Sequence, residues 1–144
     1  MAIEIGADLH VADFGILDSD GVSWLLDAPD RRAELHLDLF GDAAARANWR
    51  YRLVSRNEVY EGFRLRNARD LLRYGRHEVA LGDRVRLLSV LDENGSLPLS
   101  DCLTVIRETQ PVAAVAAMIL HGFVEVDLDE AILGPETMVR RIAR

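Results

Sequence analysis

Apolar and polar residues alternate along the first part of the chain in the way that half-buried strands require. Two such runs, His10–Leu17 and Val22–Leu26, flank the tetrapeptide Asp18-Ser19-Asp20-Gly21. Aspartate, serine and glycine at these positions are typical of a tight turn, since glycine accepts a positive φ. The pattern therefore predicts a β-hairpin over residues 10–26.

The next segment mixes strand and helix patterns. Alternation predicts strands over Glu34–Phe40 and Trp49–Ser55, although a helix continuing from Asp30 competes with the first of them. An alanine-rich helix with Asp42 as its N-cap is expected between the two strands. Helical spacing of leucines then predicts a helix within Arg56–Gly75, with the glycine just beyond its end.

The last third has the clearest pattern, which is that of three short helices followed by a β-hairpin. Ser100 and Thr109 have the residue types of N-caps, and Pro111 suits a first helical turn. Helix ends are expected at Asp92–Gly95 and at Gly122. The expected helices are Val79–Leu91, Asp101–Glu108 and Gln110–His121, and the expected strands are Phe123–Leu128 and Thr137–Ile142. This order is typical of a winged-helix module.

These elements predict an α+β fold: a truncated nuclease-like mixed sheet over residues 1–76 and a winged-helix-like domain over residues 77–144. We expect the two parts to pack as one unit, because no linker rich in glycine, serine or proline separates them. The apolar runs are too short to span a bilayer and no secretion signal is recognisable, so a cytoplasmic location without membrane contact is expected. The single cysteine, Cys102, is interpreted as a buried structural thiol.

All seventeen basic residues are arginine, and the formal net charge is −7. The absence of lysine excludes every mechanism that needs a lysine side chain, including lysine-dependent nuclease chemistry. Charge is unevenly distributed: the first third is acidic, whereas Arg50–Arg86 holds ten arginines against five acidic residues. Such separation of charge can steer the approach of a binding partner. Alternatively, the arginines pair with acidic side chains of the same molecule.

A basic stripe in this middle region is the best candidate for nucleic-acid contact. Four arginines recur at spacings of three and four, which places them on one helical face, and tyrosines are interleaved with them. Cations beside aromatic rings suit contact with a nucleic-acid backbone, although a solvated face with local ion pairs is an alternative. The candidate residues are Arg50, Arg52, Arg66, Arg69, Arg73 and Arg76.

The third helix of the C-terminal module does not have the composition of a DNA-reading helix. Residues 110–121 are polar only at their two ends, and a helix that is apolar all round is buried or covered by a partner. The expected hairpin is acidic and would repel phosphate, since it contains Glu125, Asp127, Asp129 and Glu130. We expect this module to pack against the rest of the chain, a second copy or another protein.

Three segments resemble TnsA-like transposon endonucleases, which have a restriction-endonuclease-like fold. They are the hairpin at residues 10–28, the strand Asn48–Val54 (NWRYRLV) and the helix Leu65–Tyr74 (LRNARDLLRY). Some members of that kind also end in a winged-helix-like segment similar to residues 79–142. The resemblance covers about nine-tenths of the chain.

In that family two carboxylates hold Mg²⁺ and a lysine steadies the attacking water. The resemblance places Asp13 at the first carboxylate and Asp27 at the second, but Pro29 stands where the lysine belongs. The upstream helix with its glutamate is also missing from the pattern. Both aspartates can equally be hairpin residues. A variant motif, Glu34-x-His36, is conceivable, but strand alternation explains it as well.

The leading hypothesis is a non-catalytic protein of a mobile element, phage or genome-maintenance system. It would bind a protein partner or itself, with nonspecific nucleic-acid contact through the arginine-rich helix, and would need no cofactor. One alternative is a metal-dependent DNA endonuclease subunit of a transposase that uses Asp13, Asp27 and Mg²⁺. Another is an acidic inhibitor or adaptor whose first third imitates nucleic acid. Histidines and Cys102 lack metal-ligand spacing, so no other metal site is expected.

Overall fold

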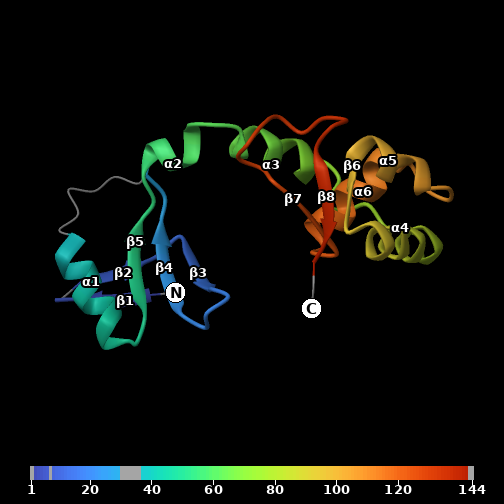
Figure 1. The fold of residues 1–144 in the computed structure, drawn as a ribbon. Coiled ribbons are helices and arrows are strands. Elements are labelled where there is room, and N and C mark those ends of the chain that lie inside the picture. Colours follow the sequence, from blue (N-terminus) through green and yellow to red (C-terminus); the bar gives the residue numbers. More distant parts are fainter. Residues whose placement is uncertain (1, 7, 30–36, 143–144) are drawn as a thin grey trace. The chain divides into compact units, whose positions relative to one another are not determined.

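The computed structural model describes residues 2–6, 8–29 and 37–142. The chain forms two compact units, Met1–Glu61 and Gly62–Arg144, which we call unit 1 and unit 2 and describe separately. Both helices and strands occur in each unit (Figure 1), so the predicted α+β class is confirmed. The boundary between the units precedes the expected one at residues 76 and 77, since the helix that follows Gly62 belongs to unit 2.

Unit 1 contains two small sheets. In the first, β1 (Ala2–Ile5) pairs with β2 (Asp8–Val11) in antiparallel register. The second sheet has the order β3-β4-β5, formed by Phe14–Leu17, Ser23–Asp27 and Arg50–Leu53. The β3–β4 pair is antiparallel and the β4–β5 pair is parallel. The chain crosses from β4 to β5 through α1 (Leu37–Arg46).

The predicted hairpin is present, but its first strand is shorter than expected. The Gly21 N–H donates to the Asp18 carbonyl at 3.1 Å, which closes the predicted turn between β3 and β4. The alternating run does not continue back to His10, because the buried Ala12 separates β2 from β3 and each strand pairs in a different sheet. An alternating pattern by itself does not show that two successive strands belong to different sheets.

The strand expected at Glu34–Phe40 is wrong for its last four residues, which begin α1, and Asp42 lies inside this helix instead of capping it. Glu34 and His36 fall outside the described residues. The helix buries Phe40, Ala43 and Ala44, whose spacing of three and one fits a helical face. These residues form a core with Leu25, Ile3 and Ala12. This tertiary contact favours the helix over the strand, the two alternatives that the sequence leaves open for this segment.

The strand predicted at Trp49–Ser55 is confirmed as β5, and the helix predicted after it is interrupted. Gly62 has φ 76°, a left-handed conformation that ends the short helix α2 (Arg56–Tyr60) before α3 (Arg64–Leu72) begins. The Ser55 hydroxyl accepts from the Glu58 N–H at 3.1 Å and caps α2. Gly75 was expected at the end of a longer helix, but α3 stops at Leu72 and Gly75 does not have a left-handed φ.

Unit 2 contains the predicted series of helices and the predicted hairpin. Its further elements are α4 (Leu81–Asn94), β6 (Ser96–Pro98), α5 (Leu99–Val105), α6 (Pro111–Leu120), β7 (Val124–Val126) and β8 (Met138–Arg141). The three strands form an antiparallel sheet of order β6-β8-β7. The strand β6 was not predicted, because three residues between two helices show no measurable alternation.

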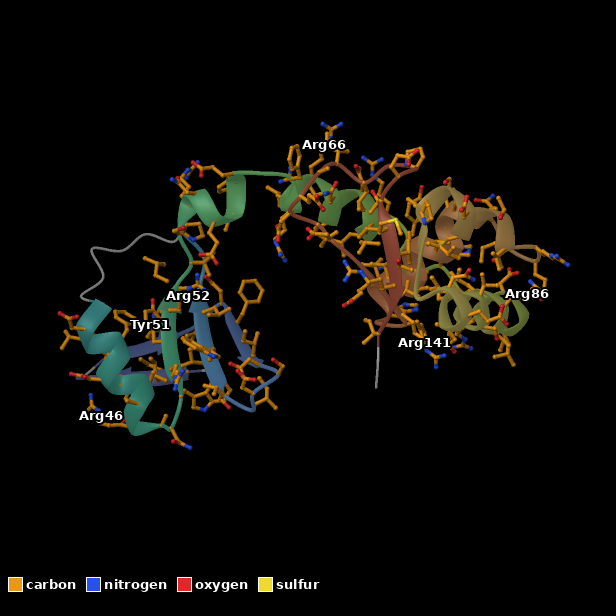
Figure 2. The ribbon with its side chains drawn as sticks, viewed as in Figure 1. Arg46, Tyr51, Arg52, Arg66, Arg86 and Arg141 are labelled. Carbon is orange, nitrogen blue, oxygen red and sulfur yellow. The ribbon has the colours of Figure 1, made fainter. Side chains whose placement is uncertain are left out.

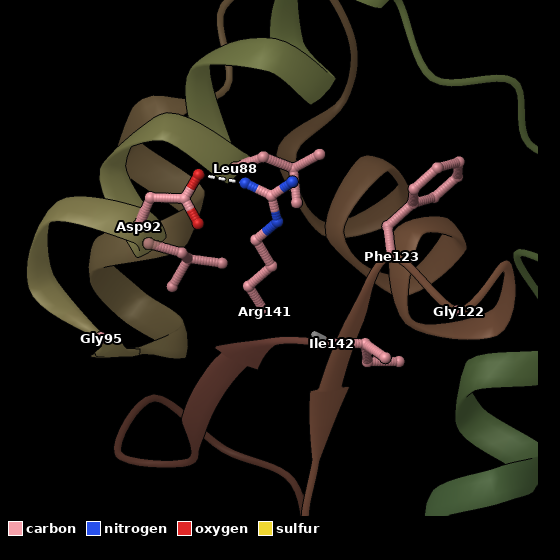
Figure 3. Close-up of a pocket in the computed structure, with 8 residues that line it drawn as sticks. Leu88, Asp92, Gly95, Gly122, Phe123, Arg141 and Ile142 are labelled. Carbon is pink, nitrogen blue, oxygen red and sulfur yellow. Dashed lines mark hydrogen bonds and ion pairs between the residues drawn. The ribbon is translucent and has the colours of Figure 1, made fainter. Parts of the chain in front are cut away.

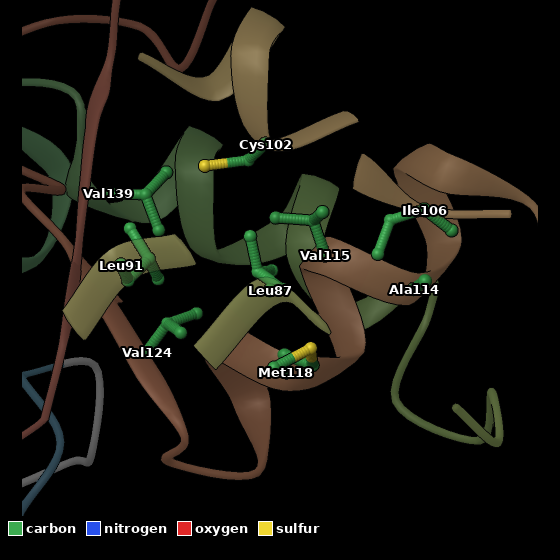
Figure 4. Close-up of a cluster of buried hydrophobic side chains, with 9 residues drawn as sticks. All are labelled: Leu87, Leu91, Cys102, Ile106, Ala114, Val115, Met118, Val124 and Val139. Atoms are coloured by element: carbon green, nitrogen blue, oxygen red, sulfur yellow. The ribbon is translucent and has the colours of Figure 1, made fainter. Parts of the chain in front are cut away.

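In unit 2 the glycines mark the ends of helices as predicted, whereas the two predicted N-cap residues do not lie directly before a helix. Gly95 and Gly122 have positive φ and follow α4 and α6, as expected. Ser100 lies inside α5, and the residue before α6 is Gln110 instead of Thr109. Figure 4 shows the core that these helices enclose with the sheet, which includes Leu87, Leu91, Cys102, Ile106, Val115, Met118, Val124 and Val139. Among the described residues, no helix has both the length and the apolar content needed to cross a membrane.

Candidate functional site

The two aspartates singled out by the resemblance lie close together in unit 1. The backbone N–H of Asp13 donates to Oδ1 of Asp27 at 3.0 Å. In return, the backbone N–H of Ala28 donates to Oδ2 of Asp13 at 2.9 Å. Each carboxylate thus accepts a hydrogen bond from a backbone N–H at or beside the other aspartate. Together the two hydrogen bonds connect the start of β3 to the end of β4.

Asp27 is fully buried, and its second oxygen has two further donors. Oδ2 accepts from the Tyr51 hydroxyl at 2.8 Å and lies 2.6 Å from Nε2 of His10. The ring of Phe40 packs edge-on against His10, with 4.5 Å between the ring centroids. Burial acts to raise the pKa of Asp27, but hydrogen bonds from Asp13, Tyr51 and His10 outweigh it and hold this pKa below its ordinary value. Asp27 is therefore a charged, hydrogen-bonded anchor inside unit 1.

This environment does not fit a catalytic Mg²⁺ site. Both oxygens of Asp27 already accept hydrogen bonds, and the carboxylate has no exposed surface through which hydrated Mg²⁺ could reach it. Within residues 2–6, 8–29 and 37–142, no group of three or more acidic, histidine or cysteine side chains is arranged to hold a metal. No lysine is present to complete the family's motif. The geometry favours the structural interpretation of Asp13 and Asp27.

Two of the six candidate arginines, Arg50 and Arg52, belong to β5 in unit 1, and both have partners there. The Arg50 guanidinium lies 5.4 Å from the centroid of the Trp24 ring. The indole N–H of Trp24 donates to Asp18 at 2.9 Å, which fixes the ring beneath this cation. Arg52 donates to both oxygens of Glu58, each at 2.7 Å. Neither arginine presents a free guanidinium.

The other four candidates belong to unit 2, where they lie on α3, at its C-cap and in the turn that follows it. Arg66, Arg69, Arg73 and Arg76 are all exposed. Spacings of three and four put Arg66, Arg69 and Arg73 on the side of the helix opposite the buried residues Asn67 and Leu71, and Arg76 lies in the turn beyond the helix. Arg73 makes one local ion pair with Asp70 at 3.3 Å. Figure 2 shows Arg66 extending away from the unit. We call these four residues the α3 arginine face.

Asn67 positions this face and was not predicted as important. Its amide nitrogen donates to the carbonyls of Leu128 and Ala131, at 2.9 and 2.7 Å. Its amide oxygen accepts from the Leu133 N–H at 3.0 Å. One buried side chain therefore holds α3 against the loop between β7 and β8. A single polar residue among leucines on the inner face of an amphipathic helix is the signal that could have revealed it.

The acidic hairpin loop is partly neutralised by α3. Arg64 donates through Nε to Asp129 at 2.6 Å and forms a second contact through its other nitrogen. The hydrogen bond from Arg64 lowers the pKa of Asp129. Asp127 accepts from the backbone N–H groups of Asp129 and Glu130 and so stabilises the loop itself. The remaining carboxylates, Glu125 and Glu130, are exposed.

The apolar helix α6 is buried as its composition indicated. Six consecutive residues, Ala113–Met118, are buried, and α3 is one of the elements packed against it. Val115 is 1% exposed, whereas Val112 in the first turn is 53% exposed. A helix covered in this way has no free face for insertion into a DNA groove. By contrast, α3 carries exposed cations on its outward side.

Asp83 is the most heavily hydrogen-bonded side chain of unit 2 among the described residues. It is fully buried on α4 and accepts from the backbone N–H groups of Arg107, Glu108 and Thr109, at 2.8, 3.0 and 2.9 Å. The Thr109 hydroxyl donates to it at 2.7 Å, and Arg86 completes an ion pair. Burial acts to raise the pKa of Asp83, but these donors hold it far below its ordinary value. Thr109, which was predicted as an N-cap, thus helps to hold the loop before α6 against Asp83.

A recess of about 590 Å³ lies between α4 and the end of β8 (Figure 3). Leu88 and Phe123 are among the apolar residues that line it, and an ion pair between Arg141 and Asp92 crosses it. Its remaining lining contains no further charged side chain. The recess therefore lacks the convergent polar groups of a catalytic pocket.

Comparison with known protein families finds no family model that matches the chain. Comparison with curated proteins likewise finds no match. The geometry described above must carry any functional conclusion by itself.

Proposed function

We propose that this chain is a non-catalytic protein of a mobile element, phage or genome-maintenance system that contacts nucleic-acid backbones nonspecifically and also binds a protein partner or a second copy of itself. The observation that carries the proposal is the α3 arginine face, with three exposed cations on the side of α3 opposite Asn67 and Leu71 and a fourth, Arg76, in the turn beyond the helix. Unit 2, with its helices and three-stranded sheet, would act as a winged-helix-like module that presents this face.

Arginines at helical spacing suit phosphate contact. Neighbouring guanidinium groups on one side of a helix can each bind a phosphate oxygen without reading base edges. Side chains of this kind give affinity that depends on salt and not on sequence. The placement of α3 by Asn67 supports such contact, because the helix that carries the cations is already held in position before binding.

The non-catalytic part of the proposal is supported by the state of Asp27. A metal-dependent nuclease needs a carboxylate that can accept a hydrated metal ion, and Asp27 is buried with both oxygens engaged. Burial of α6 supports nonspecific contact over base reading, since the helix that would enter a groove is covered.

The test is a salt titration of binding to fluorescein-labelled duplex and single-stranded DNA and RNA of arbitrary sequence, measured by anisotropy with the full chain. We expect binding at low salt that weakens steeply as salt rises. The double variant Arg69→Ala/Arg73→Ala should lower the salt slope for duplex DNA by about 2, at roughly 0.9 per lost phosphate contact. The matched control Arg107→Ala/Arg140→Ala removes two other exposed arginines of unit 2 and should leave the slope unchanged.

Equal effects of the two double variants would refute the α3 arginine face. Absence of binding to every probe at low salt would refute the nucleic-acid part altogether. If the chain instead displaces DNA from a basic protein without binding DNA itself, the acidic-mimic alternative replaces the proposal. Mg²⁺- or Mn²⁺-dependent cleavage that disappears in Asp13→Ala would establish the nuclease alternative.

A further inference from the structure

One face of the sheet β3-β4-β5 is covered inside unit 1, and the other is not covered by any element in the described part of this unit. The covered face contains the buried residues Leu25 and Asp27, and α1 packs over it. Gly15 also belongs to this face, since a Cβ built on it would lie 3.6 Å from Trp49. Because side chains alternate along strands, their neighbours point the other way. We call the second surface the open face; it carries Phe14, Ile16, Trp24, Leu26, Arg50 and Arg52.

The strand register arranges these six side chains in two rows. Phe14 is paired with Leu26, and Leu26 with Arg52. In the second row, Ile16 is paired with Trp24, and Trp24 with Arg50. The open face is thus apolar along β3 and β4 and basic along β5.

This surface is unusually apolar for one in contact with water. Phe14 is 60% exposed and Ile16 is 42% exposed, although both lie on strands of a folded sheet. Where a sheet leaves one face in contact with water, that face normally carries polar side chains. An uncovered apolar face of this kind marks an interaction surface.

The charges around the open face are self-complementary. The acidic residues lie beside β3: Asp13 precedes it, and Asp18 and Asp20 belong to the turn that follows it. Two cations lie on β5: Arg50 in the row next to that turn, and Arg52 in the row at the other end, where Glu58 already neutralises it. A second sheet laid face to face with β3 over β5 would bring Arg50 against the acidic turn of the other copy.

We propose that the open face binds the open face of a second copy of this chain, about a twofold axis parallel to the strands. Such an axis places β4 over β4 and β3 over β5, as in an aligned sandwich of two sheets about 10 Å apart. Phe14 then faces Arg52 of the other copy, and the Trp24 and Leu26 side chains form the apolar centre. Because the contact is isologous, each acidic turn meets Arg50 of the other copy. This inference rests on the proposed function only in taking the protein partner to be a second copy.

The size of the open face predicts a dimer of moderate affinity. Six side chains per copy are fewer than the roughly 20–30 residues that each partner contributes to a standard interface. The association should therefore depend on concentration in the micromolar range. Sedimentation velocity of the full chain, from about 1 to 500 μM, covers the range in which an interface of this class dissociates.

The double variant Phe14→Thr/Ile16→Thr places residues of high strand propensity at both positions of the edge strand and removes the apolar contact. We expect it to remain monomeric at concentrations at which the unaltered chain is dimeric. Leu9→Thr is the matched control, since Leu9 is a 65% exposed strand residue of unit 1 that lies in the other sheet. It should dimerise like the unaltered chain.

A charge exchange tests the orientation. Arg50→Glu alone should weaken dimerisation at least tenfold, because it places two acidic groups opposite each other, and Asp20→Arg added to it should restore the affinity. A chain that is monomeric throughout the concentration range would overturn the proposal. A dimer that Phe14→Thr/Ile16→Thr leaves intact would do the same. DNA binding by the α3 arginine face is measured separately with Arg69→Ala/Arg73→Ala, so failure of one proposal is distinguishable from failure of the other.

Discussion

Replacing the buried carboxylate of Asp83 with an amide should destabilise unit 2 severely. Asp83 joins α4 to the loop between α5 and α6, because it accepts from three successive backbone N–H groups of residues 107–109. Asp83→Asn keeps the shape of the side chain and removes only its charge and one acceptor. The variant therefore measures what the hydrogen bonds contribute to the stability of unit 2, with little change in packing.

The size of the effect follows from the number of donors at each oxygen. Oδ2 accepts from the N–H groups of Glu108 and Thr109 and from the Thr109 hydroxyl, while Oδ1 accepts from Arg107 and pairs with Arg86. Whichever oxygen becomes an NH₂ group, at least two donors then face another donor. With about 1.5–3 kcal/mol for each hydrogen bond to a charged group, we expect a loss of about 3–5 kcal/mol. This is a large fraction of the ~5–15 kcal/mol by which domains are stable.

The two units can be followed by different signals in one urea titration. Both tryptophans, Trp24 and Trp49, belong to unit 1, so their fluorescence reports unit 1. Far-UV circular dichroism is dominated by helices, of which α3–α6 belong to unit 2. Asp83→Asn should lower the midpoint of the dichroism transition and change the fluorescence transition much less. Glu93→Gln is the matched control, because it removes the same charge from an exposed position on α4 and should cost less than about 0.5 kcal/mol.

Acid unfolding gives a second measurement of the same interaction. The pKa of Asp83 in the folded state lies below its ordinary value, so its contribution is complete above about pH 4 and is lost as the pH falls further. The dichroism-monitored stability of Asp83→Asn should accordingly depend less on pH below 4 than that of the unaltered chain. Equal urea midpoints for Asp83→Asn and Glu93→Gln would refute the reasoning, as would identical acid profiles for Asp83→Asn and the unaltered chain.

Two further predictions concern other buried groups. Asp27→Asn should lower the tryptophan-monitored stability of unit 1 by about 2–4 kcal/mol, since the donors from Asp13, His10 and Tyr51 lose a charged acceptor; an unchanged fluorescence midpoint would contradict this. Burial, assisted by the nearby Asp101, raises the pKa of the Cys102 thiol to about 11. Alkylation by iodoacetamide at pH 8 should therefore be at least about a hundredfold slower in the folded chain than in urea, and equal rates would show that the thiol is accessible.

Several elements could be predicted from the sequence because local chemistry specifies them. The turn at Asp18–Gly21 follows from residue types that form it in isolation. The ends of α4 and α6 follow from Gly95 and Gly122, whose backbones accept positive φ. Burial of α6 follows from its composition, since a helix without a polar face has no surface to present to water.

Long-range contacts decided what local patterns left open. The segment after Leu37 alternates like a strand, yet it becomes a helix because Phe40, Ala43 and Ala44 complete a core with Leu25. The arginines grouped as one stripe are divided between two units, because Gly62 separates α2 from α3 and Asn67 ties α3 to a loop more than sixty residues away.

For the candidate site, the sequence by itself determined which chemistry is excluded: without lysine, no lysine-dependent mechanism is available. The spacing of Arg66, Arg69 and Arg73 also determined that they share a helical face, because 3.6 residues per turn is a property of the backbone. Only the tertiary structure decided that Asp27 is a saturated anchor, that Asp83 supports a distant loop, and that no element in the described part of unit 1 covers the second face of β3-β4-β5. Burial and hydrogen-bond partners depend on residues far apart in the chain, and no local pattern contains that information.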